Sequence, residues 1–180
     1  MTRDEDALVQ RAKQGDPTAF AEIYVRHQPA IYRYIFYRVD DVATAEDLTG
    51  EVFVRLVEKV DRFTYRGRPL LAWLYTIARN LVTDYHRHAR RSLPLSLEEQ
   101  PITDLADPEK TVEHRLAQHR LAVAIARLTE DQRQVILLRF IEGLDNKAVA
   151  QILDKSVGAV KALQHRALAA LRHILERGED

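Results

Sequence analysis

A row of cationic and hydrogen-bonding side chains recurs within the segment WLYTIARNLVTDYHRHARR, residues 73–91. The row consists of Thr76, Arg79, Asn80, Thr83, Arg87, Arg90 and Arg91. Arginine neutralises phosphate groups, while asparagine and threonine hydrogen-bond base edges, so this combination suits a polyanion that also presents bases. Taken alone, such a row more often means a solvated, arginine-rich helix face.

An amphipathic helix is the element that would place this row on one side. The apolar residues of the segment recur at three- and four-residue steps, which is the period of a helix with one buried face. They are Trp73, Leu74, Ile77, Ala78, Leu81, Val82 and Tyr85. We therefore predict a helix over residues 73–91 with an exposed polar face.

A second polar row is mainly acidic and lies in AEDLTGEVFVRLVEKVDRF, residues 45–63. It consists of Glu46, Asp47, Glu51, Arg55 and Glu58. The inward positions are expected to be Ala45, Leu48, Val52, Phe53, Leu56, Val57, Val60 and Phe63. Thr44 is the expected N-cap of this helix. From charge alone, simple solvation is the favoured account of the acidic row.

The segment KAVAQILDKSVGAVKALQHR, residues 147–166, has the parts of a helix-turn-helix. A short helix, a three-residue turn and a second helix follow one another, and the second helix of such a unit enters the major groove by its N-terminal end. The candidates for groove or phosphate contact are Lys155, Ser156, Val157, Gly158, Lys161, Ala162, His165 and Arg166. An αα-corner in an ordinary helical bundle is the alternative.

Helical periodicity continues through the other segments, so the sequence predicts an all-α fold. The remaining helices are expected at residues 4–14, 17–27, 29–39, 109–128 and 130–142, with a capping box at Thr129 to Gln132. The helix at 109–128 is expected to bury Leu116, Leu121 or Val123, Ile125 and Leu128. Two further helices are expected at residues 146–153 and after a Ser156 cap, and a loop at residues 61–69. The aromatic cluster of Tyr32, Tyr34, Phe36 and Tyr37 is expected to pack in the core.

Charge alternates along the chain although the total net charge is zero. Residues 40–61 carry net −5, residues 63–91 net +5, residues 92–113 net −5 and residues 114–180 net +3. Alternating surfaces suggest more than one partner. The proline-containing, acidic stretch 92–108 is predicted to link an N-terminal domain, 1–91, to a C-terminal domain, 109–180.

Several classes of function are disfavoured by composition. The chain has no cysteine, so it offers neither disulfides nor thiolate metal sites. His86, His88, His114 and His119 lack carboxylates at ligand spacing, so no metal site is expected. No cofactor-binding glycine loop or nucleophile motif occurs, and the chain is not expected to be an enzyme. With no signal peptide or membrane span apparent, we expect a soluble cytoplasmic protein.

Three of these segments, in this order, resemble bacterial sigma factors of the extracytoplasmic-function (ECF) group over nearly the whole chain. Residues 45–63 resemble the family's core-polymerase-binding helix, and residues 73–91 resemble its promoter-melting, minus-ten-reading helix. Residues 128–171, from LTEDQRQVILLRFIEGLDNKAVAQIL to GAVKALQHRALAAL, resemble its minus-thirty-five-reading domain. The resemblance implies binding to core RNA polymerase and to promoter DNA.

The resemblance also implies roles for the candidate residues. The acidic row would dock on clamp helices of the polymerase largest subunit, although Gly50 stands where the family commonly has glutamine. The loop at residues 64–69, with Tyr65, Arg66 and Arg68, would hold a flipped base near Asn80. The arginines at 87, 90 and 91 would hold phosphates, and Asp84 would orient neighbouring side chains. The acidic linker would thread near the polymerase active-site channel.

An anti-sigma protein is a further partner that the resemblance implies, because family members are commonly held by one. The chain ends soon after its last helix, so no appended sensor domain is expected. The alternative from another class is a helix-turn-helix regulator that binds duplex DNA without polymerase. A third possibility is an all-α interaction module with solvated basic faces. The helices at 45–63 and 73–91 discriminate, because a simple regulator needs neither.

Overall fold

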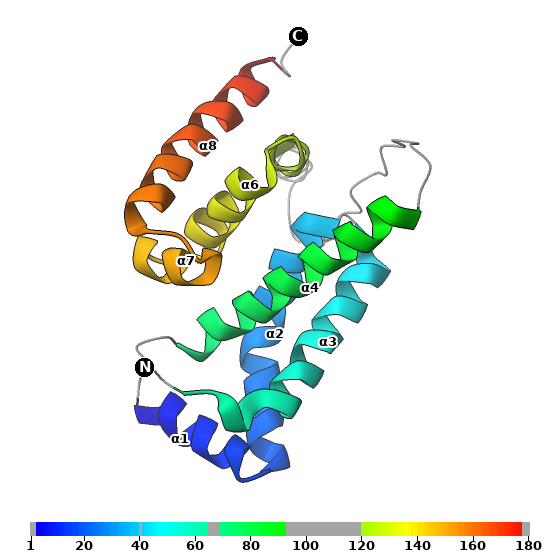
Figure 1. Ribbon diagram of the computed structural model, residues 1–180, viewed down its shortest axis with the longest axis vertical. Helices are drawn as coiled ribbons and strands as arrows, with labels where there is room; N and C mark the ends of the chain where they lie inside the picture. Colours follow the sequence, from blue (N-terminus) through cyan, green and yellow to red (C-terminus); the bar gives the residue numbers. More distant parts are fainter. Residues whose placement is uncertain (1–2, 40, 65–68, 93–119, 178–180) are drawn as a thin grey trace, which may run out of the picture.

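The computed structural model describes residues 3–39, 41–64, 69–92 and 120–177. All regular elements among these residues are helices, which confirms the predicted all-α fold. The N-terminal half contains α1 to α4. The C-terminal half contains a helical segment at residues 120–126, followed by α6, η2, α7 and α8. The two halves are in contact, with α7 packed against α4 (Figure 1).

The first two helices, α1 (Arg3–Lys13) and α2 (Pro17–Val39), are joined by a tight turn. Gly15 adopts a φ of +79°, a left-handed conformation that glycine reaches without strain. Asp16 then caps α2, since its Oδ1 accepts the backbone N–H of Thr18 at 2.9 Å. Hydrogen bonds from Thr18 and from Arg11 lower the pKa of Asp16 to about 2.

Helix α2 continues through Pro29, so the prediction that a separate helix begins there is wrong. Proline removes one backbone hydrogen bond and disfavours a helix interior. Burial on both sides of the proline offsets this cost, because Ile23, Ile31, Tyr34 and Ile35 are all 0% exposed. Tertiary packing therefore holds one long helix where the local signal predicts a break.

Helix α3 (Val42–Lys59) is capped by Asp41, and the predicted cap at Thr44 is wrong. The Asp41 Oδ2 accepts the backbone N–H of Thr44 at 2.7 Å, so Thr44 is the donor of the capping bond. Hydrogen bonding from Thr44 lowers the pKa of Asp41. A carboxylate at this end also complements the helix dipole.

Most of the predicted inward stripe of α3 is buried, and Val57 is the exception. The buried side chains of α3 are Ala45, Thr49, Val52, Phe53 and Leu56, and Leu48 is half-buried. Val57 is 54% exposed and was assigned to the wrong face. Val60 begins a short 3₁₀ helix, η1 (Val60–Arg62), so the predicted loop at 61–69 starts later than expected.

Helix α4 (Leu70–Ser92) lies against α2 and α3 and begins three residues before the predicted start. Glu5 of α1 accepts the backbone N–H of Leu70 at 3.2 Å and so caps the new start. Leu74, Ala78 and Val82 are 0% exposed, which confirms the inward stripe. Because this cap comes from a residue distant in the sequence, the local pattern places the start of α4 too late.

The aromatic cluster of α2 packs inside the N-terminal half, as expected. Tyr34 is 0% and Phe36 is 2% exposed, while Tyr32 and Tyr37 are half-buried. The Tyr34 ring lies edge-on to that of Tyr75 in α4, with ring centroids 5.2 Å apart. These rings therefore join α2 to α4 rather than offering a surface for bases to stack on.

The C-terminal half begins, among described residues, with the helical segment 120–126; Leu116 and the predicted start at residue 109 lie outside them. Ile125 and Leu128 are buried as predicted. Of the alternatives Leu121 and Val123, Val123 is half-buried, whereas Leu121 is 36% exposed.

A capping box starts α6 (Glu130–Ile136), as the sequence predicts. The backbone N–H of Thr129 donates to the Oε1 of Gln132 at 3.2 Å. The helix passes into a π-helical turn, η2 (Leu137–Ile141), and ends at Gly143, whose φ is +69°. Phe140, on this turn, is 49% exposed.

The predicted helix-turn-helix is formed by α7 (Asn146–Leu153) and α8 (Val157–Arg177). Asp154 has a φ of 54°, the left-handed conformation that ends α7. Ser156 caps α8, because its Oγ accepts the backbone N–H of Ala159 at 3.1 Å. Ala150 is 6% exposed, and its small side chain suits the close crossing of the two helices.

We expect Gly50→Ala to raise the free energy of unfolding by about 1 kcal/mol, because alanine is the better residue inside a helix. An added Cβ at Gly50 would meet no atom within 4 Å. Urea unfolding followed by circular dichroism measures the change. Gly15→Ala is the contrasting control, since the φ of +79° strains alanine and should lower stability. Destabilisation by Gly50→Ala would contradict this account.

We expect Ser156→Ala to cost about 1 kcal/mol of stability through loss of the α8 N-cap. Ser156→Asp retains a capping oxygen and should stay near the parent. Thermal melts of both variants test the cap. Equal losses in the two would show that the hydroxyl acts in another way.

Candidate nucleic-acid and polymerase interfaces

Helix α4 carries the described part of the predicted minus-ten surface. Asn80, Thr83 and Arg87 are exposed on one side of the helix, while Thr76 and Arg79 are half-buried. The hydroxyls of Thr76 and Thr83 donate to the backbone carbonyls of Ala72 and Arg79, at 3.0 and 2.8 Å. These two threonines are therefore satisfied locally, and Asn80 and Arg87 present the more available polar groups.

Asp84 and Arg87 form an ion pair on α4 at 3.0 Å, one helical turn apart. The expected role of Asp84 as a residue that orients its neighbours fits this pairing. Both side chains are more than half exposed, so the pair adds little to stability. The ion pair instead biases the direction in which the Arg87 guanidinium points.

Arg79 differs from the rest of the row because it faces the C-terminal half. Its Nη1 donates to the backbone carbonyl of Ile152 in α7 at 3.4 Å, a long contact. Three other predicted residues of this surface, Tyr65, Arg66 and Arg68, lie outside the described residues, as do the side chains of Arg90 and Arg91.

The predicted acidic surface lies on the outer side of α3. Glu46, Asp47 and Glu58 are exposed, and Glu51 accepts a hydrogen bond from the Nε of Arg55 at 2.8 Å. This bond raises the pKa of Arg55. Arg55 therefore offsets part of the negative charge without removing it.

An apolar groove that sequence reasoning missed lies beside the acidic surface, between α2 and α3. Its volume is about 350 Å³, and its lining residues are Phe20, Ala21, Tyr24, Gly50, Phe53, Val54, Leu56 and Val57. Val54 and Val57 are more than half exposed. Val54, three residues before Val57 and outside the predicted inward stripe, is the signal that could have revealed a second apolar face.

The helix-turn-helix exposes most of its candidate residues at the start of α8. Val157, Gly158, Lys161, Ala162, His165 and Arg166 are exposed. Two turn residues have structural duties instead. Lys155 pairs with Asp131 of α6 at 3.1 Å, and Ser156 caps α8. The N-terminal turns of α8 thus expose Lys161, His165 and Arg166 beside small and apolar residues.

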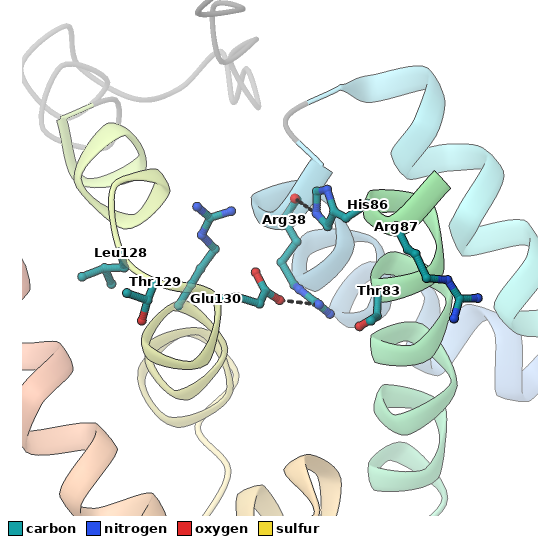
Figure 2. Close-up of a pocket in the computed structure, with 8 residues that line it drawn as sticks. Arg38, Thr83, His86, Arg87, Leu128, Thr129 and Glu130 are labelled. Atoms are coloured by element: carbon teal, nitrogen blue, oxygen red, sulfur yellow. Dashed lines mark hydrogen bonds and ion pairs between the residues drawn. The ribbon is translucent and has the colours of Figure 1, made fainter. Parts of the chain in front are cut away.

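A cleft between the two halves was not predicted (Figure 2). Its volume is about 800 Å³, and it is lined by Arg38, Thr83, His86, Arg87, Leu128, Thr129, Glu130 and Arg133. Arg38 and Glu130 meet across it as an ion pair. The Nε2 of His86 lies 2.9 Å from the backbone oxygen of Arg38, and burial lowers the pKa of His86.

Glu142 forms a second polar contact between the halves. Its carboxylate accepts hydrogen bonds from Arg33 Nε and Nη2, at 2.7 and 2.8 Å, and from the Tyr75 hydroxyl at 2.8 Å. The hydrogen bond to Glu142 raises the pKa of Arg33, and burial raises the pKa of Tyr75. Sequence spacing gave no signal for these contacts, because the partners are 67 and 109 residues apart.

In the described part of the chain, no group of three or more His, Asp or Glu residues is placed to hold a metal ion. His114 and His119 lie outside it. No described helix combines the length and apolar character that crossing a membrane requires.

Family models match two parts of the chain. The Sigma-70 region 2 model matches residues 23–92, which include α3 and α4. The Sigma-70 region 4 model matches residues 118–171, which include the helix-turn-helix.

Curated relatives and a solved structure agree with these matches. The chain is 41% identical to the ECF RNA polymerase sigma factor BldN of Streptomyces coelicolor, covering 93% of this chain and 64% of BldN. It is 34% identical to the ECF sigma factor SigD of Mycobacterium tuberculosis H37Rv, covering 93% of this chain and 82% of SigD. CnrH, solved in complex with the cytosolic domain of CnrY, is 25% identical with a TM-score of 0.75, covering 96% and 97% of the two chains. On these matches, the chain belongs to the ECF RNA polymerase sigma factors.

Proposed function

We propose that this chain binds core RNA polymerase and directs promoter-specific initiation of transcription. The observation that carries the proposal is the presence in one chain of a region 2 unit with exposed polar faces on α3 and α4 and a region 4 helix-turn-helix. A regulator that binds only duplex DNA needs the helix-turn-helix alone. Catalysis belongs to the polymerase, so the chain itself acts without chemistry of its own.

Docking on the polymerase is assigned to α3. The exposed acids Glu46, Asp47 and Glu58, with the Glu51–Arg55 pair, supply charge that would speed and orient association with a basic partner surface. The neighbouring apolar groove would supply hydrophobic contact area, and Gly50 lies in its lining. The acidic side chains and the groove together favour a partner-binding surface over simple solvation.

Reading of the melted minus-ten element is assigned to α4 and the loop before it. Asn80 is exposed and can hydrogen-bond the edge of an unstacked base, while Arg87 can hold a phosphate. The roles that the resemblance implies are proposed also for Tyr65, Arg66, Arg68, Arg90 and Arg91. Duplex binding at the minus-thirty-five element is assigned to the exposed start of α8, with Lys161, His165 and Arg166 as its polar contacts.

The proposed organisation has an N-terminal domain of residues 1–91, an acidic linker of residues 92–108 and a C-terminal domain of residues 109–180. The linker would pass near the active-site channel of the polymerase. The protein would act in the cytoplasm, where an anti-sigma protein would hold it. Likeness to CnrH, whose structure contains a bound cytosolic domain of CnrY, supports a partner of that kind.

Adding the purified protein to core polymerase should give specific run-off transcription from a cognate promoter. Reversing the charge of Glu46, Asp47 and Glu58 to lysine should reduce core binding, because the complementary surface is lost. Run-off assays and co-purification with core measure both effects. Tight binding to duplex promoter DNA without any association with core would instead favour the helix-turn-helix regulator.

Asn80→Ala should change base preference at one melted position, whereas Arg87→Ala should weaken binding to all sequences. The guanidinium acts on phosphate, so its loss should also reduce the salt slope by about one. Binding to fork-junction DNA with each base at each minus-ten position, at several salt concentrations, separates the two effects. An unchanged preference profile in Asn80→Ala would refute its role in base reading.

A further inference from the structure

The Glu142 carboxylate is nearly enclosed between the two halves of the chain. Its side chain is 3% exposed, and Arg33 holds it through two hydrogen bonds of 2.7 and 2.8 Å. The Tyr75 hydroxyl adds a third bond. Both partners belong to the N-terminal half, so this buried charge is satisfied only by contact across the interface.

A second set of contacts lies beside the first, and it too pairs an acid of the C-terminal half with an arginine of the N-terminal half. Glu130 pairs with the fully buried Arg38, whose Nη1 donates to the Tyr34 hydroxyl at 2.9 Å. The Tyr34 hydroxyl also lies 3.5 Å from the Oε1 of Gln134 in α6. In both ion pairs the acid comes from the C-terminal half and the arginine from α2. Ion pairs with the same orientation therefore join the two halves at both places.

This closed arrangement conflicts with simultaneous reading of two promoter elements. The minus-ten and minus-thirty-five elements are about 25 base pairs apart, which is about 85 Å of B-form DNA. Helix α4, of 23 residues, is about 35 Å long. Because α7 packs directly on α4, the start of α8 lies too close to α4 to reach the second element.

The contact with α7 also covers part of the minus-ten surface. Arg79 is half-buried and directed to the Ile152 carbonyl, while Asn80, next to it, is exposed. The start of α8 remains exposed in the same arrangement. Separation of the halves would therefore free α4 more than α8.

We propose that Glu142 and Arg33 form an intramolecular latch that holds the free chain closed, and that the latch must release before the chain binds both promoter elements. The claim that the latch releases before promoter binding rests on the function proposed above, whereas the claim that the free chain is closed does not. On opening, water solvates Glu142 again. Loss of one partner therefore penalises the closed state and leaves the open state nearly unaffected.

Fluorescence energy transfer between the halves tests closure directly. The chain has no cysteine, so Lys59→Cys in α3 and His173→Cys in α8 give two dye sites. Glu142→Gln should shift the equilibrium toward the open form by on the order of tenfold or more and lower the transfer, because a charge-assisted contact is lost. Arg26→Ala is the matched control: Arg26 is on the same helix, pairs with Glu22 and Asp4, and should leave transfer unchanged.

A double-mutant cycle tests whether the two residues act as a pair. Arg33→Gln should open the chain as Glu142→Gln does, and the double variant should open it no further than one change alone. Multiplying effects would show independent action and overturn the latch. Circular dichroism melts confirm that every variant is folded. Association with core polymerase and DNA carrying both elements, measured by stopped flow, should be faster for Glu142→Gln. The rate should rise by the same factor as the fraction of open chain.

The outcomes separate the latch from the function. Unchanged transfer together with an unchanged association rate in Glu142→Gln would overturn the latch, whatever the function is. Lower transfer without transcription by parent or variant would support the latch and overturn the proposed function. Lower transfer with unchanged association on two-element DNA would overturn the claim that release precedes promoter binding.

Discussion

The packing of α4 is the constraint on which the rest of the structure depends. Its inward stripe, with Leu74, Ala78 and Val82 fully buried, is held against α2 and α3. A helix fixed in this way must direct Asn80 and Arg87 outward, because at about 100° per residue both lie roughly opposite Ala78 and Val82. The rigid core therefore fixes where a melted strand would meet the chain.

The same N-terminal core creates the surface proposed to bind polymerase, without further elements. Burying one face of α3 leaves its acids outside, and an apolar groove lined by residues of α2 and α3 lies beside them. Charged groups orient a partner over a distance, whereas apolar area contributes once contact is made. Two adjacent surfaces of different character thus arise from one pair of packed helices.

Contact between the halves forms ion pairs that neither half can form alone. Glu142 and Glu130 each form an ion pair with an arginine of the other half, and these two ion pairs exist only while the halves touch. Buried charge is tolerated when it is paired and costly when it is not. Such ion pairs hold the halves together, and loss of one partner would destabilise their contact.

The sequence by itself determined the helical class, the order of the helices and the local caps at Thr129 and Ser156, although the cap of α3 is Asp41 and not Thr44. The periodicity of α4, the Thr129 capping box, the α7 boundaries and the Ser156 cap follow from neighbours within a few residues, which is the range at which such signals act. The tertiary structure decided the continuation of α2 through Pro29, the start of α4 beneath Glu5 and the exposure of Val57. It alone brought Arg33 and Tyr75 to Glu142, because burial and long-range pairing depend on distances that only folding sets.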